Sequence, residues 1–413
     1  MKASKNIPAQ QKLLNAEELR PLCIDYRPSA GENFSMSKIE LIATATFGLE
    51  AIVAQEVKDL GYDKLNIENG KVTFDADENA ICRANLWLRT ADRVRLKVGE
   101  FKATTFDQLF EQTKALPWPD LLPADAAFPV DGKSVNSILF SISDCQAIVK
   151  KAIVESMKKR YRTEWFKEEG PLYKIEITML KDLATLTIDT SGPGLHKRGY
   201  RAAGSEAPLR ETLAAALILL SRWQPETALI DPLCGSGTIP IEAALIGQNI
   251  APGMNRNFAS EEWPIIPREL WREARKETHD LADYNRELDI SGTDLDSDLI
   301  NIARKNAIEA GVENLIHFQA KPLAELSSKK KYGKVICNPP YGERLGTQRE
   351  VERLYKDMGK LFRKLDSWSY YILTAYDDFE RFFGKQASKR RKLYHGNIKV
   401  QYYQYFGPRP PKR

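Results

Sequence analysis

The strongest constraint on the fold of this chain is a repeated alternation between residues 228 and 340. Apolar runs that suit buried strands are each followed by a turn rich in glycine, acidic residues or proline, and helical patterns lie between them. Strands that alternate with helices in this way predict an α/β fold with a doubly wound parallel sheet. Such sheets bind ligands beyond the carboxyl ends of their strands, so we expect the functional residues in these turns.

The first turn lies within "ALIDPLCGSGTIPIEAALI" (228–246), between a strand ending at Asp231 and a helix starting near Thr238. A phosphate-binding P-loop would need Gly-Lys-Ser/Thr, which is absent, and a dinucleotide site would need a third glycine where Pro240 stands. The remaining ligand is S-adenosylmethionine, with the strand-end acid near its cationic end and glycines that let backbone amides approach it. A purely structural turn stays open as the alternative. The predicted cofactor-binding residues here are Asp231, Leu233, Gly235, Gly237 and Thr238.

The second turn follows a strand that ends at Asp294, in "ISGTDLDSDLINIARKNAIEAGV" (290–312). A carboxylate at this place can accept hydrogen bonds from both ribose hydroxyls, and Leu295 could pack on an adenine face. In dinucleotide enzymes the equivalent acid comes about 20 residues after the glycines, and here the gap is far longer. Asp294 could instead cap the following helix, although Asp296 or Ser297 could also do so.

The third turn interrupts "KVICNPPYGERLG" (334–346), where the strand must end near Asn338 because prolines cannot donate to a sheet. The Asn338 side-chain oxygen and the Pro339 carbonyl are two acceptors for the two N–H groups of an exocyclic amine. Binding both would direct the nitrogen lone pair and stabilise its growing positive charge. Prolines keep the loop stiff, and Tyr341 offers a ring for a flipped base. The predicted catalytic residues are Asn338, Pro339, Pro340 and Tyr341.

The region before the turns predicts a smaller module of mixed strands and helices without a catalytic constellation. We expect strands at 38–46, 70–77, 134–143, 172–180 and 183–191, and helices at 47–62, 106–118 and 144–162. The last helix would have Asp144 as its N-cap and would project basic side chains outward, which suits a binding role. Its candidate residues for binding a polyanion such as RNA are Lys150, Lys151, Lys158, Lys159 and Arg160.

Composition and charge indicate what kind of partner, metal site and cellular compartment to expect. The net charge is +5, but two dense basic runs (150–162 and 385–392) favour a polyanionic partner over the alternative of solvated surfaces. Five scattered cysteines without a C-x-x-C pair and four isolated histidines argue against a metal site and fit a reducing cytoplasm. We expect no membrane span and no signal peptide. Residues 1–37 read as an extension with one helical candidate at 16–22, and translation is hypothesised to begin at Met36.

Together these motifs resemble the class I S-adenosylmethionine-dependent methyltransferases that act on amino groups. The segments "TSGPGLHKRGYRAAGSEAPLRETLAAAL", "LIDPLCGSGTIPIEAA" and "NPPYGERLG" are similar to the THUMP-domain family of RNA guanine-N2 methyltransferases, especially the bacterial 23S rRNA type. The resemblance implies a ferredoxin-like subdomain (38–95), a THUMP RNA-binding domain (96–190) and a Rossmann-like methyltransferase domain (191–413). A tRNA-directed enzyme of this family and a non-catalytic RNA-binding protein remain alternatives, and the oligomeric state is open.

The resemblance also assigns residues that the motifs alone do not. His196, Arg198, Gly199, Tyr200 and Arg201 match the family signature at the joint between the modules, and it implies RNA contacts for Arg198 and Arg201. Family members often carry an aspartate for the adenine amine after the third strand; here Lys321-Pro322 stands there, so Ala320 or another group must serve. Segment 255–277 resembles a family insertion, in which we expect Phe258 and Trp263 to pack rather than to stack on RNA.

Overall fold

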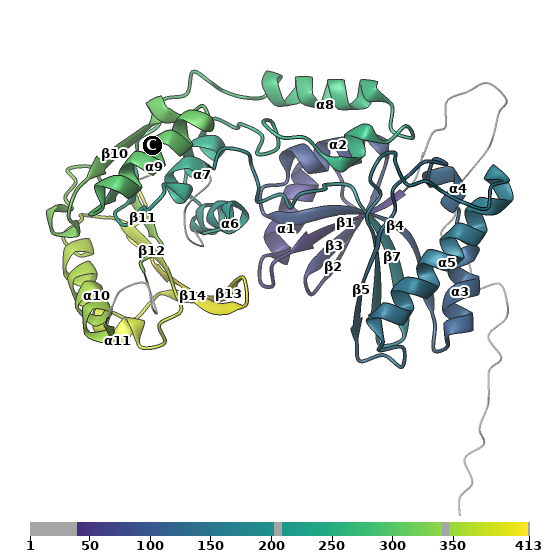
Figure 1. Cartoon of the computed structure of the whole chain (residues 1–413). Coiled ribbons are helices and arrows are strands. Elements are labelled where there is room, and N and C mark those ends of the chain that lie inside the picture. Colours follow the sequence, from purple (N-terminus) through teal and green to yellow (C-terminus); the bar gives the residue numbers. More distant parts are fainter. Residues whose placement is uncertain (1–38, 202–208, 341–346, 412–413) are drawn as a thin grey trace, which may run out of the picture.

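The computed structural model describes residues 39–201, 209–340 and 347–411. They form two lobes side by side, each built on a seven-stranded sheet (Figure 1). The predicted extension 1–37, with its helical candidate and Met36, lies outside the described residues. Within the described ranges, no helix is both long enough and apolar enough to cross a bilayer.

The sheet of the N-terminal lobe has the order β2-β3-β1-β4-β7-β6-β5. Only β5 and β6 pair in parallel; the other neighbours are antiparallel. The 12-residue strand β4 crosses the predicted 95/96 boundary and pairs with β1 on one side and β7 on the other, so the two halves share one sheet. The strands are β1 (Ile39–Ala45), β2 (Leu65–Glu68), β3 (Lys71–Ala76), β4 (Ala91–Lys102), β5 (Val130–Val135), β6 (Ile175–Leu180) and β7 (Leu183–Asp189).

Side chains of each strand alternate between the two faces of this sheet, and the helices of the lobe pack on the apolar face. In β4, Val94, Leu96 and Val98 are buried in the helix-covered core, and the intervening residues point to the opposite face. The helices are α1 (Glu50–Asp59), α2 (Glu78–Trp87), α3 (Phe106–Lys114), α4 (Trp118–Leu121) and α5 (Ile142–Tyr161).

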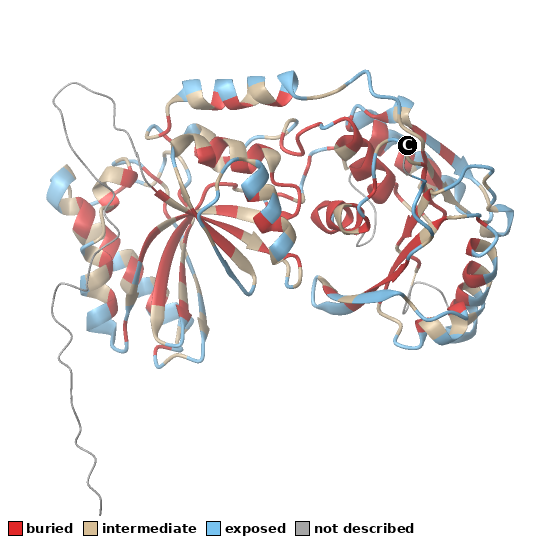
Figure 2. Ribbon diagram, turned by 180° about the vertical axis from the view of Figure 1, so that it is seen from behind, coloured by how far each residue is buried: buried red, intermediate tan, exposed pale blue. Residues whose placement is uncertain are grey.

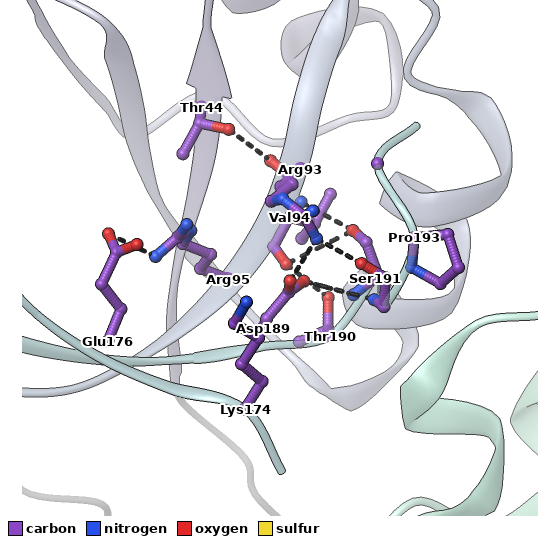
Figure 3. A network of polar contacts seen from close by, with 12 residues as sticks. Thr44, Arg93, Val94, Arg95, Lys174, Glu176, Asp189, Thr190, Ser191 and Pro193 are labelled. Carbon is purple, nitrogen blue, oxygen red and sulfur yellow. Dashed lines mark hydrogen bonds and ion pairs between the residues drawn. The ribbon is translucent and has the colours of Figure 1, made fainter. Parts of the chain in front are cut away.

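The opposite face of the same sheet carries charges that neutralise one another (Figure 3). Arg95 of β4 forms an ion pair of 2.6 Å with Glu176 of β6, and Arg93 pairs with Asp189 of β7 and donates to the Gly192 carbonyl. Lys97 continues the row with Glu40 of β1 at 3.3 Å. Because each cation has a carboxylate partner, this face offers little net positive charge to a polyanion.

The predicted strand at 134–143 is wrong, and so is the Asp144 N-cap. β5 ends at Val135 because Asn136 adopts a φ of +50°, and α5 begins at Ile142 after Ser141. The intervening loop is held by the Ile138 N–H, which donates to the Asp182 carboxylate at 2.7 Å. Of the apolar residues that suggested a longer strand, Ile138 and Phe140 are exposed in this loop, at 61% and 80%, whereas Leu139 is buried.

The second sheet confirms the predicted doubly wound topology, with the order β10-β9-β8-β11-β12-β14-β13. The first five strands are parallel and β14 and β13 are antiparallel additions. The chain order reverses beside β8, which makes the carboxyl ends of β9, β8 and β11 the expected ligand position. The strands are β8 (Leu229–Asp231), β9 (Ile290–Asp294), β10 (Ile316–Ala320), β11 (Lys334–Cys337), β12 (Ser369–Thr374), β13 (Lys389–His395) and β14 (Ile398–Tyr405).

Helices cover both faces of this second sheet. On one face α6 (Glu211–Ser221), α7 (Thr238–Gly247) and α9 (Ser297–Glu309) share a core, and on the other lie α10 (Gln348–Phe362) and α11 (Phe379–Phe383). α6 and α7 are apolar and almost wholly buried, which is where Figure 2 shows red helices beside the sheet. The short 3₁₀ turns within the described ranges are η2 (Ala259–Glu262), η3 (Glu313–Leu315) and η4 (Leu323–Glu325).

Residues 250–281 form an arm that leaves the C-terminal lobe and packs into the other one. The arm contains α8 (Arg268–Asp280), which lies above α1 and α2 of the N-terminal lobe in Figure 1. Phe258 and Trp263 are 3% and 1% exposed in the N-terminal core, and Trp263 stacks on Tyr173 with ring centroids 4.4 Å apart. The expectation that these two aromatic residues pack is confirmed.

Candidate active site

A cavity of about 820 Å³ lies where β8, β9 and β11 end. Its walls combine the glycine-rich turn, the β9–α9 turn and the start of the proline loop, so the topology brings the three predicted motifs together. The predicted residues that line it are Asp231, Leu233, Gly235, Thr238, Asp294, Leu295, Asn338 and Pro340.

Asp231 is a buried carboxylate, 2% exposed, at the centre of this arrangement. Its Oδ1 accepts a hydrogen bond of 3.2 Å from the Leu233 N–H, and no Lys or Arg of the described residues forms an ion pair with it. Burial raises its pKa well above the ordinary 3.8, and the negative charge of Asp294 raises it further. A cationic ligand group beside Asp231 would compensate this buried charge.

Gly235 and Gly237 of the glycine-rich turn have different structural roles. Gly235 has a φ of +52° with open space where a side chain would start, lines the cavity, and donates its N–H to Asp294 Oδ2 at 2.9 Å. Gly237 has a φ of +83°, and a Cβ there would lie 2.9 Å from both Ala303 and the Phe318 ring. Gly237 therefore serves the packing of α7 against α9 and β10, in place of the ligand contact expected for it.

Asp294 is not a helix cap. Asp296 caps α9 by accepting from the Asp298 and Leu299 N–H groups at 2.8 and 3.3 Å. Asp294 instead bridges two turns, because its second oxygen accepts from the Asp296 N–H at 3.1 Å. Leu295, 76% exposed at the cavity, presents an apolar surface of the kind that a ligand ring could cover.

Asn338 follows β11 and carries an unpaired acceptor. Its Oδ1 atom is buried and has no hydrogen-bond partner among the described residues. A buried polar atom without a partner is rare in a native fold and points to a bound group. Tyr341, the last predicted catalytic residue, lies outside the described residues.

Several lining residues carry no motif that sequence reasoning could use. Leu209 precedes α6, Ile239 lies on α7 and Leu354 on α10, and each looks like an ordinary apolar residue in the sequence. Pro322 and Leu323 line the part of the wall where an adenine contact was sought, whereas Ala320 is not among the lining residues.

Arg198 does not fit the RNA-binding role expected for it. It is 3% exposed, and its guanidinium donates to the Leu195 and Arg89 carbonyls and pairs with the buried Glu242 of α7. Tyr200 donates to the same carboxylate at 3.0 Å. These contacts bind the two lobes together, so Arg198 is a structural residue of the joint.

Arg201 is also directed inward, towards the cavity wall. Its guanidinium donates to the Leu209 carbonyl at 3.0 Å and to the Thr238 hydroxyl at 3.2 Å, and pairs with Glu211 at 3.2 Å. Leu209 and Thr238 both line the cavity. Arg201 therefore connects two walls of the site.

The basic helix α5 is mostly charge-compensated. Lys150 pairs with Glu168 at 2.6 Å, Lys158 with Glu164 at 2.8 Å, and Arg160 with Asp120. Lys151 and Lys159 are exposed and have no ion pair within the described ranges, so they are the two predicted cations of this helix that stay available to an RNA.

The residues present fit S-adenosylmethionine better than a metal. The cavity offers a buried carboxylate for a cation, a second carboxylate at the next strand end, and the apolar surface of Leu295. No group of three or more His, Cys, Asp or Glu side chains among the described residues is arranged to hold a metal ion. The described cysteines, Cys82, Cys145, Cys234 and Cys337, are free and buried.

Models of known protein families match each of the three parts of this architecture. The families described as "RlmL ferredoxin-like domain", "THUMP domain" and "RMKL-like, methyltransferase domain" match residues 40–95, 103–189 and 198–404. The Bacillus subtilis protein named "Putative RNA methyltransferase YpsC" is 53% identical over 380 residues, which are 92% of this chain and 98% of that protein.

Two crystal structures share both the fold and the sequence. One, from Listeria monocytogenes, is of "a predicted N6-adenine-specific DNA methylase"; it is 57% identical with a TM-score of 0.87, covering 90% of this chain and 97% of that one. The other, of "SMU.472, a putative methyltransferase complexed with SAH", is 48% identical with a TM-score of 0.86, covering 91% and 99%. The chain therefore belongs to the RMKL-like methyltransferase family, and in this chain a ferredoxin-like and a THUMP domain precede the methyltransferase domain.

Proposed function

We propose that this protein transfers a methyl group from S-adenosylmethionine to the exocyclic N2 amine of a guanosine in structured RNA, with 23S rRNA as the target. The observation that carries the proposal is the buried Asn338 oxygen after β11, which has no hydrogen-bond partner among the residues that the structure describes and lies beside a cavity that also holds a buried carboxylate. Family membership supports the reaction class, and the SAH in the related crystal structure supports the cofactor.

Asn338 and Pro339 act on the nucleophile. The lone pair of an exocyclic amine is delocalised into the base, which makes the nitrogen a poor nucleophile. Two carbonyl acceptors, Asn338 Oδ1 and the Pro339 oxygen, bind its two N–H groups, orient the lone pair and stabilise the positive charge that develops on nitrogen. The proton leaves after transfer, so this step needs no strong base.

The remaining residues hold the cofactor. S-adenosylmethionine supplies a methyl group activated by a sulfonium. Asp231 faces its cationic end, Asp294 accepts from the ribose hydroxyls, and Leu295 with Pro322 packs on the adenine. The Gly235–Asp294 hydrogen bond of 2.9 Å fixes the glycine-rich turn relative to the ribose site.

RNA is preferred to DNA because of the N-terminal lobe. The THUMP and ferredoxin-like matches stand where a DNA enzyme would need a target-recognition region, and the Bacillus relative is named as an RNA enzyme. The Listeria name refers to an adenine amine, which an Asn-Pro-Pro-Tyr loop would also accept. The choice of guanine N2 and of 23S rRNA rests on the family resemblance of the joint and loop motifs.

Product analysis tests this proposal directly. Purified protein is incubated with deuterated-methyl S-adenosylmethionine and with 23S rRNA, 16S rRNA or tRNA from cells that lack it, and nucleosides are identified by mass spectrometry. Labelled N2-methylguanosine in 23S rRNA is expected. Label in N6-methyladenosine would overturn the guanine assignment, and label confined to tRNA would overturn the 23S rRNA assignment.

Replacing the proposed acceptor tests the catalytic role. Asn338→Ala is expected to lower turnover about 10²- to 10³-fold, the usual effect of losing one preorganised polar contact to the transition state, with an unchanged cofactor Kd. Calorimetric titration measures the Kd and single-turnover assays the rate. Asn66→Ala, on an exposed strand of the other lobe, is the control and should retain full activity. Near-normal turnover of Asn338→Ala would refute the assignment.

A further inference from the structure

The β13–β14 hairpin extends past the edge of the sheet at which the candidate active site lies. β14 runs antiparallel to β12, and Thr374, the last residue of β12, pairs with Gln401. The hairpin continues beyond this pair to its tip, where His395 pairs with Ile398. Asp231, Asp294 and Asn338 also lie at the carboxyl ends of parallel strands, so the hairpin tip projects from the side on which an RNA would approach Asn338.

The same hairpin reaches the other lobe, as Figure 1 shows for β13 beside α1 and β3. Arg391 donates to the Gly48 carbonyl at 3.1 Å, and the Phe47 and Tyr394 rings meet edge to face with centroids 5.8 Å apart. Gly48 has a φ of +91°, and a Cβ there would lie 2.9 Å from the Lys392 carbonyl oxygen, so this approach requires glycine. Residues of both lobes therefore form one continuous surface.

This surface combines aromatic rings with cations that lack carboxylate partners. Phe47 is 47% exposed, and Lys392 Nζ lies 5.9 Å from its ring centroid and 5.2 Å from that of Tyr394. Lys399 is exposed and pairs with Tyr394 across the hairpin, so the two point to the same face. No ion pair joins Lys392 or Lys399 to a carboxylate within the described ranges, in contrast to most cations of α5.

We propose that Phe47, Lys392, Tyr394 and Lys399 form an RNA-docking surface, here called the hairpin platform, that guides the substrate to Asn338. Phe47 stacks on an unpaired base, and Lys392 and Lys399 contact the phosphates that flank it. This proposal rests on the proposed function, since it takes RNA as the substrate. A protein partner fits less well, because interface cores between proteins are depleted in lysine, whereas single-stranded RNA regions present planar bases and phosphates together.

Equilibrium binding of variants tests the hairpin platform. Phe47→Ala should weaken the Kd for the RNA that the wild type binds by about 5- to 150-fold, the range for one base–aromatic stack. The double variant Lys392→Gln/Lys399→Gln should lower the slope of log K against log[salt] by about 1 to 2, because it removes up to two phosphate contacts. Cofactor Kd should stay unchanged in both.

Matched controls come from other surfaces of the C-terminal lobe. Lys305→Gln/Lys360→Gln removes two exposed lysines of α9 and α10, and Tyr284→Ala removes an aromatic residue that is 53% exposed. If the platform variants bind RNA as tightly as the wild type does, or lose no more affinity than the control variants, the inference is overturned. The proposed function would survive that result as long as the wild type methylates RNA. Platform-dependent binding without any methylation by the wild type would instead overturn the proposed function alone.

Discussion

Asp231 illustrates how a single residue couples function to stability. Its carboxylate is buried with one hydrogen bond of 3.2 Å, and its raised pKa means that the folded protein holds the proton more tightly than the unfolded chain does. The stabilising effect of that proton is fully present below the unfolded-state pKa and is lost as pH rises through the folded-state pKa. Without a bound cation, the folded state therefore becomes less stable relative to the unfolded chain as pH rises from the unfolded-state pKa towards the raised folded-state pKa of Asp231.

Asp231→Asn is accordingly expected to stabilise the cofactor-free protein at pH 8 by about 1 kcal/mol, in the range typical of relieved active-site strain. The difference from wild type should shrink as pH falls towards 4, where the wild-type carboxyl is protonated. Urea unfolding of both proteins across this pH range measures it. Cofactor affinity should fall at least tenfold in the variant; a variant that binds the cofactor normally would contradict the assigned contact.

Sequence reasoning identified the individual cavity residues that lie at the end of a strand or directly after it. Asp231, Asp294 and Asn338 could be found because each comes after an apolar run, and the sheet topology then brings them together. Arg198 could not be assigned, because its partner Glu242 is buried 44 residues later in the chain and nothing local indicates the pairing. The compensation of Lys150 by Glu168 depends on tertiary contacts in the same way.

Among the elements, the glycine-rich turn sets the distance between α7 and its neighbours. Gly237 touches α9 and β10, whereas Gly235 faces the cavity, although the two glycines look equivalent in the sequence. The sequence pattern indicated where the turn lies, and the structure places that turn at the cavity wall, but the pattern could not distinguish the roles of the two glycines. A strand was likewise expected at 134–143 because apolar residues alternate there, and the positive φ of Asn136 that ends β5 has no clear sequence signal.

Gly237→Ala should destabilise the protein by about 3 kcal/mol, because it combines a left-handed backbone with a Cβ that contacts Ala303 and Phe318. Gly235→Ala, with an open site for its Cβ, should cost about 1 kcal/mol and act mainly on cofactor affinity. Urea unfolding and calorimetric titration of the two variants measure both effects. Equal loss of stability in the two variants would contradict the packing role of Gly237.

Arg201 connects the segment before α6 to the start of α7. Arg201→Ala should weaken cofactor binding about tenfold, since its hydrogen bonds position the cavity residues Leu209 and Thr238. The salt dependence of RNA binding should not change. Lys197→Ala, four residues earlier and exposed, is the control and should leave cofactor binding intact. A reduced salt slope with normal cofactor affinity would restore the RNA-binding role expected from the family resemblance.

At the level of the whole molecule, the arm of residues 250–281 makes the two lobes depend on each other. Arg83 of α2 forms an ion pair of 2.8 Å with Glu277 of α8, and Trp263 completes the core around Tyr173. The doubly wound sheet and the mixed module before it were predictable from periodicity. The packing of the arm against the N-terminal lobe could not be predicted. Its apolar residues indicate that it is buried, but they do not indicate in which of the two cores.

Trp263→Ala should lower the free energy of unfolding by about 3–5 kcal/mol, the usual cost of removing a large core aromatic residue. Because the arm joins both cores, we expect a single calorimetric transition that shifts to lower temperature as a whole. Trp165→Ala, at an 80% exposed position, should change stability by less than about 0.5 kcal/mol. Two separate transitions in the Trp263→Ala protein, with the C-terminal one unshifted, would argue against the coupling.

The arm also imposes an order on biosynthesis. The N-terminal lobe is translated by Arg201, yet its core lacks Trp263 and α8 until residue 280 has emerged. At about 5–20 residues per second, synthesis of this stretch takes roughly 4–16 s, during which the N-terminal domain is incomplete. A nascent chain of this kind is a natural client for holding chaperones, and moving the arm's sequence closer to the first domain would shorten that exposure.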